Sequence, residues 1–323
     1  MILITGATGR IGGALAKRLI SSKKYKGKVR ILVRDVLKAK TQFGSTVEIF
    51  EGDLASAHDF IAIAQACKGV DAIIHCAASV DYSLPEREMM QQNYFGTARL
   101  IKSAKLQKKS PKFIFISSTS IYRGVDGEIS EATPPKPFNA YGKSKLEAEN
   151  ALKNSGLNYI ILRPSVVYGE GFKTGFAPVI KMIAKGRMPI IGFGKNHIPH
   201  IYLSDLVDAI ILALESKLKH EDFIISSGEK ITQLEAYGII AKELGVSPPN
   251  LHFPKSISYF AAGLGHSLYL LLGKKPKIFR EYVHTVAENK VINIGKATKL
   301  LHFRPKVGFK AGIKKLIAGI RGA

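Results

Sequence analysis

The sequence predicts an α/β protein with a doubly wound parallel sheet and a smaller C-terminal substrate-binding region. Three observations lead to this prediction. Short apolar, β-branched runs recur along the chain, helical patterns lie between them, and 323 residues suffice for one large domain with an appendage. Because neighbouring parallel strands need a crossover that is usually a helix, the alternation favours helices on both faces of the sheet.

The elements follow from the local pattern of the residues. Ile11, Leu15 and Leu19 repeat every four residues and predict the inner stripe of a helix between the first two strands. After Gly169 the pattern loosens, and Pro, Gly and Lys become frequent. We expect strands at Ile2–Thr5, Val29–Val33, Val47–Phe50, Ala72–Cys76, Lys112–Ser117, Asn158–Arg163 and Phe223–Ser226.

Composition excludes several classes of protein. With 46% hydrophobic and 23% charged residues the chain is not disordered, and its two cysteines exclude a disulfide framework and a four-cysteine zinc site. We expect no metal site. The chain opens M-I-L-I-T-G, and cleavage of a leader there would remove the glycine-rich loop, so we expect a cytoplasmic protein.

The net charge of +23 is unevenly distributed, because 13 Lys and Arg face only two acids in the last 51 residues. Such an end suits nucleic acid, an anionic membrane or an acidic substrate, and it is equally compatible with a solvated surface that binds nothing. We expect nucleic acid not to be the partner. Peripheral contact with an anionic membrane, and a homodimer, stay open.

A phosphate site is predicted where the first strand runs into T-G-A-T-G-R-I-G-G. Gly6, Gly9 and Gly12 lie three residues apart, so the backbone is able to approach a pyrophosphate at a helix N-terminus. We therefore expect a dinucleotide-binding Rossmann domain over residues 1–170, to which residues 200–228 return. Residues 171–323 are expected to form the mostly helical, basic substrate region.

The choice of cofactor depends on the end of the second strand, which reads V-R-D. Arg34 suits a 2′-phosphate, and Arg10 in the glycine loop lies within reach of the same group. Asp35 is the residue that would instead bind the ribose of NAD. We favour NADP over NAD.

Acid-base chemistry is predicted for Y-G-K-S-K. Tyr141 and Lys145 share one helix face because they are four residues apart, and Ser117 and Ser118 end a preceding strand. A neighbouring ammonium and a cationic nicotinamide favour the ionised phenol, which then exchanges a proton with a substrate hydroxyl. Alone, Y-x-x-x-K is also common on ordinary amphipathic helices.

Together these segments resemble the extended branch of the short-chain dehydrogenase/reductase superfamily, an epimerase/dehydratase-like group, over most of the chain. The 3β-hydroxysteroid dehydrogenase-like and dihydroflavonol reductase-like enzymes look nearest. The matching segments are G-A-T-G-R-I-G, G-D-L, H-C-A-A, N-Y-F-G-T, S-S-T-S-I-Y, Y-G-K-S-K, L-R-P-S-V-V-Y-G and H-I-Y-L-S-D-L-V.

The resemblance implies roles for individual residues. Asp53 would hold the adenine amino group, Lys145 the nicotinamide ribose, and Asn93 a relay water. Ser118 is preferred to Ser117 as the residue that orients the substrate oxygen, with Thr119 next. The expected catalytic residues are Ser118, Tyr141, Lys145 and Asn93; the expected cofactor contacts are Gly6, Thr8, Gly9, Arg10, Ile11, Gly12, Arg34, Asp53, Leu54, Ala77, Tyr141, Lys145 and Pro164; the expected substrate contacts are Val80, Ser118, Val166 and Ile198.

Two departures from the family pattern bear on the substrate. Sugar-nucleotide members usually carry an asparagine where this chain has Val166 and an arginine where it has Ile198, and a diphosphate without partners is costly. An apolar stretch over residues 256–273 precedes the cations from Lys274 to Arg280, as in an interfacial element or a buried lid. We expect an NADP(H)-dependent oxidoreductase that interconverts a secondary alcohol and a ketone on a sterol- or isoprenoid-like substrate. The alternatives are a nucleotide-sugar epimerase or dehydratase with bound NAD, and a non-catalytic dinucleotide sensor that binds RNA or protein.

Overall fold

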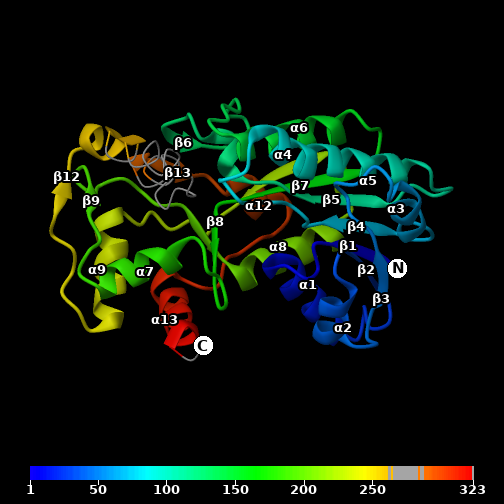
Figure 1. Ribbon diagram of the computed structural model, residues 1–323, viewed down its shortest axis with the longest axis horizontal. Helices are drawn as coiled ribbons and strands as arrows, with labels where there is room; N and C mark the ends of the chain where they lie inside the picture. Colours follow the sequence, from blue (N-terminus) through cyan, green and yellow to red (C-terminus); the bar gives the residue numbers. More distant parts are fainter. Residues whose placement is uncertain (261–262, 265–282, 284–286, 322–323) are drawn as a thin grey trace.

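The computed structural model describes residues 1–260, 263–264, 283 and 287–321. Its centre is a parallel sheet of seven strands in the order β11-β7-β5-β4-β1-β2-β3, which confirms the expected fold (Figure 1). The expected strands are all present, with ends displaced by at most two residues. They are β1 Ile2–Thr5, β2 Val29–Val33, β3 Glu48–Glu51, β4 Ala72–His75, β5 Lys112–Ile116, β7 Tyr159–Pro164 and β11 Glu221–Ile225.

Helices cover both faces of this sheet, as Figure 1 shows. On one face lie α1 (Arg10–Ser21), α2 (Val36–Phe43) and α8 (Leu203–Glu215), where Leu15 and Leu19 are fully buried and Ile11 is half-buried. On the other lie α3 (Phe60–Ala66), α5 (Gly96–Lys105) and α6 (Ala140–Lys153). Shorter segments link them: α4 (Glu86–Met90), a π-helical turn η1 (Gln91–Phe95) and a 3₁₀ turn η2 (Thr119–Tyr122).

A second lobe has its own apolar core around the buried side chains of Tyr168 and Tyr202. Its helices are α7 (Phe176–Ala184), α9 (Gln233–Leu244) and α13 (Phe309–Arg321). Three two-stranded parallel pairs complete the described chain: β8 (Val166–Tyr168) with β10 (His200–Tyr202), β9 (Ile190–Ile191) with β12 (His252–Phe253), and β6 (Gly127–Ile129) with β13 (Lys290–Ile292).

Two segments from the second half of the chain return to the main sheet. Residues 200–228 contribute α8 and the edge strand β11. Beyond that expectation, α12 (Gly295–Leu300) also packs there, because Ala297, Leu301 and Phe303 join the core beneath α1 and α8.

Most of the apolar stretch 256–273 and all the cations from Lys274 to Arg280 lie outside the described residues. Within the described part of the chain, none of the helices is long and apolar enough to cross a bilayer.

Candidate active site

The glycine loop leaves the N-terminus of α1 without a side-chain cap among the described residues. Gly6 has a φ of +70°, and a Cβ on it would lie 2.7 Å from the Ala77 nitrogen, so β1 and β4 approach each other there only because Gly6 lacks a side chain. A Cβ on Gly12 would lie 2.4 Å from the Gly6 oxygen. The uncapped N–H groups of the first turn, which includes Ile11, fit an anionic pyrophosphate.

At the end of β2, Asp35 and Arg34 have different roles. The Asp35 carboxylate accepts a hydrogen bond of 2.9 Å from the Lys38 nitrogen and so caps α2. The Arg34 side chain is exposed beside it. The Arg10 guanidinium lies against Gly171 in the loop that follows β8, since a Cβ on Gly171 would be 2.3 Å from the Arg10 Nη1.

Asp53, Leu54 and Ala77, which are expected to contact the cofactor, follow the carboxyl ends of β3 and β4. The Asp53 carboxylate accepts a hydrogen bond of 2.9 Å from the Ala55 nitrogen, which folds this side chain over its own turn. Leu54 is buried against Gly96, and the Ala77 nitrogen donates to the Thr5 hydroxyl over 3.3 Å. Of the loop residues, Thr8 is half-buried and Gly9 is exposed.

Tyr141 and Lys145 lie four residues apart on α6, and both are buried. Burial raises the pKa of Tyr141, and the hydrogen bond with Ser118 and the charge of Arg123 lower it in part. Burial also lowers the pKa of Lys145 to about 8. Tyr141 is therefore protonated at neutral pH in this structure.

The Lys145 ammonium has its partners at the end of β5 in this structure. Its Nζ donates over 2.7 Å to the Ile116 oxygen at the end of β5 and lies 4.6 Å from the centre of the Phe115 ring. The groups that lower the pKa of Tyr141 are instead Ser118 and Arg123. The reason is tertiary, because the strand end offers the buried ammonium a carbonyl partner.

Ser117 and Ser118 are adjacent in the sequence, but their hydroxyls have different hydrogen-bond partners. The Ser117 hydroxyl is buried and donates over 2.5 Å to Glu149, whereas Ser118 caps η2 and is hydrogen-bonded with Tyr141. This arrangement supports Ser118 as the residue that orients a substrate oxygen. Thr119, the next choice, is the first residue of η2.

Asn93 lies in η1, and π-helical turns are frequent at functional sites. Its amide nitrogen donates to the Ser144 hydroxyl and to the Ser79 oxygen, both over 3.0 Å, and its oxygen accepts from the Ser79 nitrogen over 2.7 Å. Asn93 thereby joins the loop after β4 to α6, next to Tyr141.

The side chains of Tyr82 and Arg123 lie beside Tyr141, and the sequence did not predict this contact. We call these two side chains the wall of the site. The Tyr82 ring meets the Tyr141 ring edge-on with centroids 5.8 Å apart, and the Arg123 guanidinium lies 5.6 Å from the Tyr82 centroid. Arg123 is 8% exposed. The position of Arg123, directly after the S-S-T-S-I-Y segment, was the available signal.

The expected substrate contacts are dispersed. Val80 is exposed in the loop after β4, near Tyr82 in sequence. Val166 and Ile198 are half-buried and pack against the apolar core of the second lobe. Pro164, the last residue of β7, is buried.

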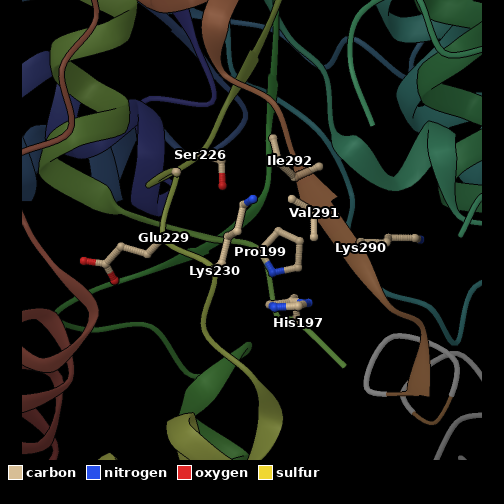
Figure 2. A pocket seen from close by; sticks show the side chains of 9 residues that line it. His197, Pro199, Ser226, Glu229, Lys230, Lys290, Val291 and Ile292 are labelled. Atoms are coloured by element: carbon tan, nitrogen blue, oxygen red, sulfur yellow. The ribbon is translucent and has the colours of Figure 1, made fainter. Parts of the chain in front are cut away.

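Near Ile198, a small cavity separates β13 from the loop that follows β11 (Figure 2). Its volume of about 10 Å³ holds no more than about one water, so it is no substrate site. Figure 2 shows the Lys230 amine pointing into this space and Lys290 extending away from it.

Buried ion pairs of Arg163 link β7 to α6 and β11. Arg163, 2% exposed, contacts Glu149 and Asp222, each over 2.6 Å, and Glu149 is fully buried. The Arg163 guanidinium also donates to the Tyr122 hydroxyl over 2.7 Å. Thus the arginine of L-R-P-S-V-V-Y-G has a structural role in this chain.

Comparison with known proteins decides the family. The model of the NAD dependent epimerase/dehydratase family matches residues 2–226. The chain belongs to this family. It is therefore an NAD(P)-dependent enzyme of the extended short-chain dehydrogenase/reductase type, as the motifs indicate.

Relatives of this epimerase/dehydratase family member include several epimerases. The UDP-glucose 4-epimerase of Vibrio cholerae is 28% identical over 76% of this chain and 75% of its own length. An N-acetyl-alpha-D-glucosaminyl-diphospho-ditrans,octacis-undecaprenol 4-epimerase of Escherichia coli O157:H7 is 24% identical over 85% of this chain and 81% of its length. A UDP-glucuronic acid 4-epimerase from Bacillus cereus, solved with NAD, shares the fold with a TM-score of 0.76 at 24% identity, over 99% of this chain and 98% of that one.

Proposed function

We propose that this enzyme epimerises a secondary alcohol of a sugar through a transient ketone. The observation that carries the proposal is the wall of Tyr82 and Arg123 beside Tyr141. An aromatic face and a buried cation suit a polar sugar bearing an anionic group better than a sterol. The epimerase names of relatives support the same reading.

In this proposal each residue of the site has a separate role in the reaction. Tyr141 is protonated in this structure, and a bound cationic nicotinamide would favour its ionised form. The phenolate would then take the proton of the substrate hydroxyl as the substrate carbon loses hydride, and Ser118 would hold the reacting oxygen. The glycine loop would hold a nicotinamide cofactor, which would supply the hydride acceptor and donor. Asn93 carries the proton relay and Lys145 holds the nicotinamide ribose. The alcohol would be inverted when hydride returns to the opposite face of the carbonyl carbon and Tyr141 returns the proton to the carbonyl oxygen, so the reaction would have no net oxidant or reductant.

Val166 and Ile198 indicate which group is attached to the sugar and carries it into the site. Both are half-buried among apolar side chains of the second lobe, where an asparagine or an arginine would serve a nucleotide diphosphate better. By its name, the Escherichia coli relative acts on a sugar joined through a diphosphate to undecaprenol. A polyprenyl diphosphate sugar would satisfy both the apolar residues and the cationic wall. In this proposal the described residues within 171–199, 229–294 and 304–321 form the substrate side.

The test compares the two carriers. We expect the enzyme with NAD or NADP to convert an N-acetylglucosaminyl polyprenyl diphosphate into its 4-epimer with no lasting absorbance of reduced nicotinamide. We expect calorimetry with UDP-sugars to give no micromolar binding. Micromolar binding of a UDP-sugar would instead indicate that the enzyme is a nucleotide-sugar epimerase.

A second candidate, the NADP(H)-dependent oxidoreductase of an apolar alcohol or ketone, is favoured by Val166 and Ile198 alone. It predicts that an apolar ketone consumes NADPH in equal amount to product. That result, together with no epimer from either sugar, would replace the epimerase.

For the cofactor, NADP stays our proposal because Arg34 is exposed while Asp35 caps α2. Replacing Arg34 by Ala is expected to weaken NADPH binding by about 1.5 to 3 kcal/mol, the range for hydrogen bonds to charged groups, and to leave NADH binding almost unchanged. The measurement is fluorescence titration of both cofactors. Lys38→Ala, which removes a neighbouring exposed cation, is the control. Equal weakening of NADPH and NADH by Arg34→Ala would contradict the assignment.

A further inference from the structure

The tip of the second lobe exposes a group of large apolar side chains around the β9–β12 pair. The pair is held by the Ile190 nitrogen donating to the Leu251 oxygen and the Gly192 nitrogen donating to the Phe253 oxygen, both over 2.8 Å. Phe193, two residues after the end of β9, is 82% exposed. In Figure 1 this tip lies at the end of the molecule away from β3 and α2.

The helical residues 255–260 extend the same surface. Tyr259 faces inward, where it packs with Ile191, Val283 and Ala287. Ile257 and Phe260, three residues apart and hence on one face of the helix, are exposed, and Phe260 is 73% exposed. We call the following exposed side chains the tip patch: Phe193, Leu251, Phe253, Ile257, Phe260 and Leu264.

The charges beside the tip patch are almost all positive. Lys185 and Arg187 precede β9 and Lys195 follows it, and all three are exposed. The stem of Lys255 lies against Gly192, 3.6 Å from where a Cβ would be.

Few Asp and Glu residues lie near the tip patch in the sequence, and Glu235 and Glu288 have hydrogen-bond or ion-pair partners. No Asp or Glu occurs between residues 171 and 204 or between 246 and 280 of the sequence. Of the nearby described acids, Glu235 caps α9 with Thr232, and Glu288 pairs with Lys290.

We propose that the tip patch inserts into the interface of an anionic lipid bilayer. Exposed aromatic and aliphatic side chains gain free energy in the acyl boundary, and the cations around them are attracted to anionic headgroups. A protein partner is a poorer match, because it would need a face both apolar and strongly acidic. The surface differs from the cations at Lys274 to Arg280 and uses only described residues. It does not depend on the epimerase proposal, since binding to vesicles requires no substrate.

The test is flotation of the full chain with phosphatidylcholine vesicles, with and without phosphatidylglycerol, at low and high salt. We expect flotation with the anionic vesicles at low salt and little with the neutral ones. The double variant Lys185→Gln/Arg187→Gln should lower the partition coefficient about 30-fold, which corresponds to about 1 kcal/mol for each cation. Phe193→Ser/Phe260→Ser should lower it at least about tenfold.

Matched controls separate this surface from general stickiness. Ile61 on α3 is 74% exposed, so Ile61→Ser tests an equally exposed apolar residue elsewhere. Lys105→Gln/Lys108→Gln removes two exposed cations far from the tip. The proposal is wrong if the protein does not float, floats equally with neutral vesicles, or is affected equally by the control variants. It is also wrong if the protein is a dimer that Phe193→Ser/Phe260→Ser dissociates, since the patch is then a contact between copies.

Discussion

Replacing Tyr141 by Phe is expected to lower kcat at least about 100-fold, as loss of a general acid-base group usually does. The phenyl ring keeps the edge-on contact with Tyr82, whose ring centroid is 5.8 Å away. Only the oxygen that is hydrogen-bonded with Ser118 is lost. The variant should therefore fold and bind the nicotinamide cofactor with nearly unchanged affinity, which fluorescence titration measures.

The control for this variant is Tyr25→Phe. Tyr25 donates to Glu215 on the opposite side of the sheet from Tyr141, so its loss should leave kcat unchanged. If Tyr141→Phe keeps more than about a tenth of kcat, another group carries the proton and the assignment fails.

Replacing Arg163 by Met is expected to lower the free energy of unfolding by about 3 to 5 kcal/mol, the usual cost of leaving a buried charge without its partner. Glu149 has no exposed surface, so it cannot gain hydration in exchange. Urea denaturation followed by circular dichroism measures the loss. The double variant Glu149→Gln/Arg163→Met should recover most of it, because the neutral amide removes the uncompensated charge.

An exposed pair provides the comparison. Lys24 and Glu215 are 2.7 Å apart, with side chains 63% and 38% exposed, so Lys24→Met should lower the free energy of unfolding far less than Arg163→Met does. Equal losses for Lys24→Met and Arg163→Met would show that burial does not determine the strength of the pair.

The two predictions draw on different sources of information. Tyr141 and Lys145 were recognisable because a spacing of four places residues on one helix face, whatever the rest of the fold. The partners of Arg163 were not recognisable, because Glu149 on α6 lies 14 residues away and Asp222 on β11 lies 59 residues away, and no local periodicity relates side chains at those separations. Family motifs marked Arg163 without revealing what it binds.

The sequence by itself determined the parallel sheet, the glycine loop before α1, the family and the positions of the acid-base residues. These depend on periodicity and on short spacings, which act within a few residues. Only the tertiary structure decided that Lys145 turns to the Ile116 oxygen, that Tyr82 and Arg123 wall Tyr141, and that Phe260 faces solvent. The first two features arise where separate segments of the chain meet, and each side chain there takes a partner that lowers the cost of its burial. The exposure of Phe260 follows from its helix packing inward through Tyr259.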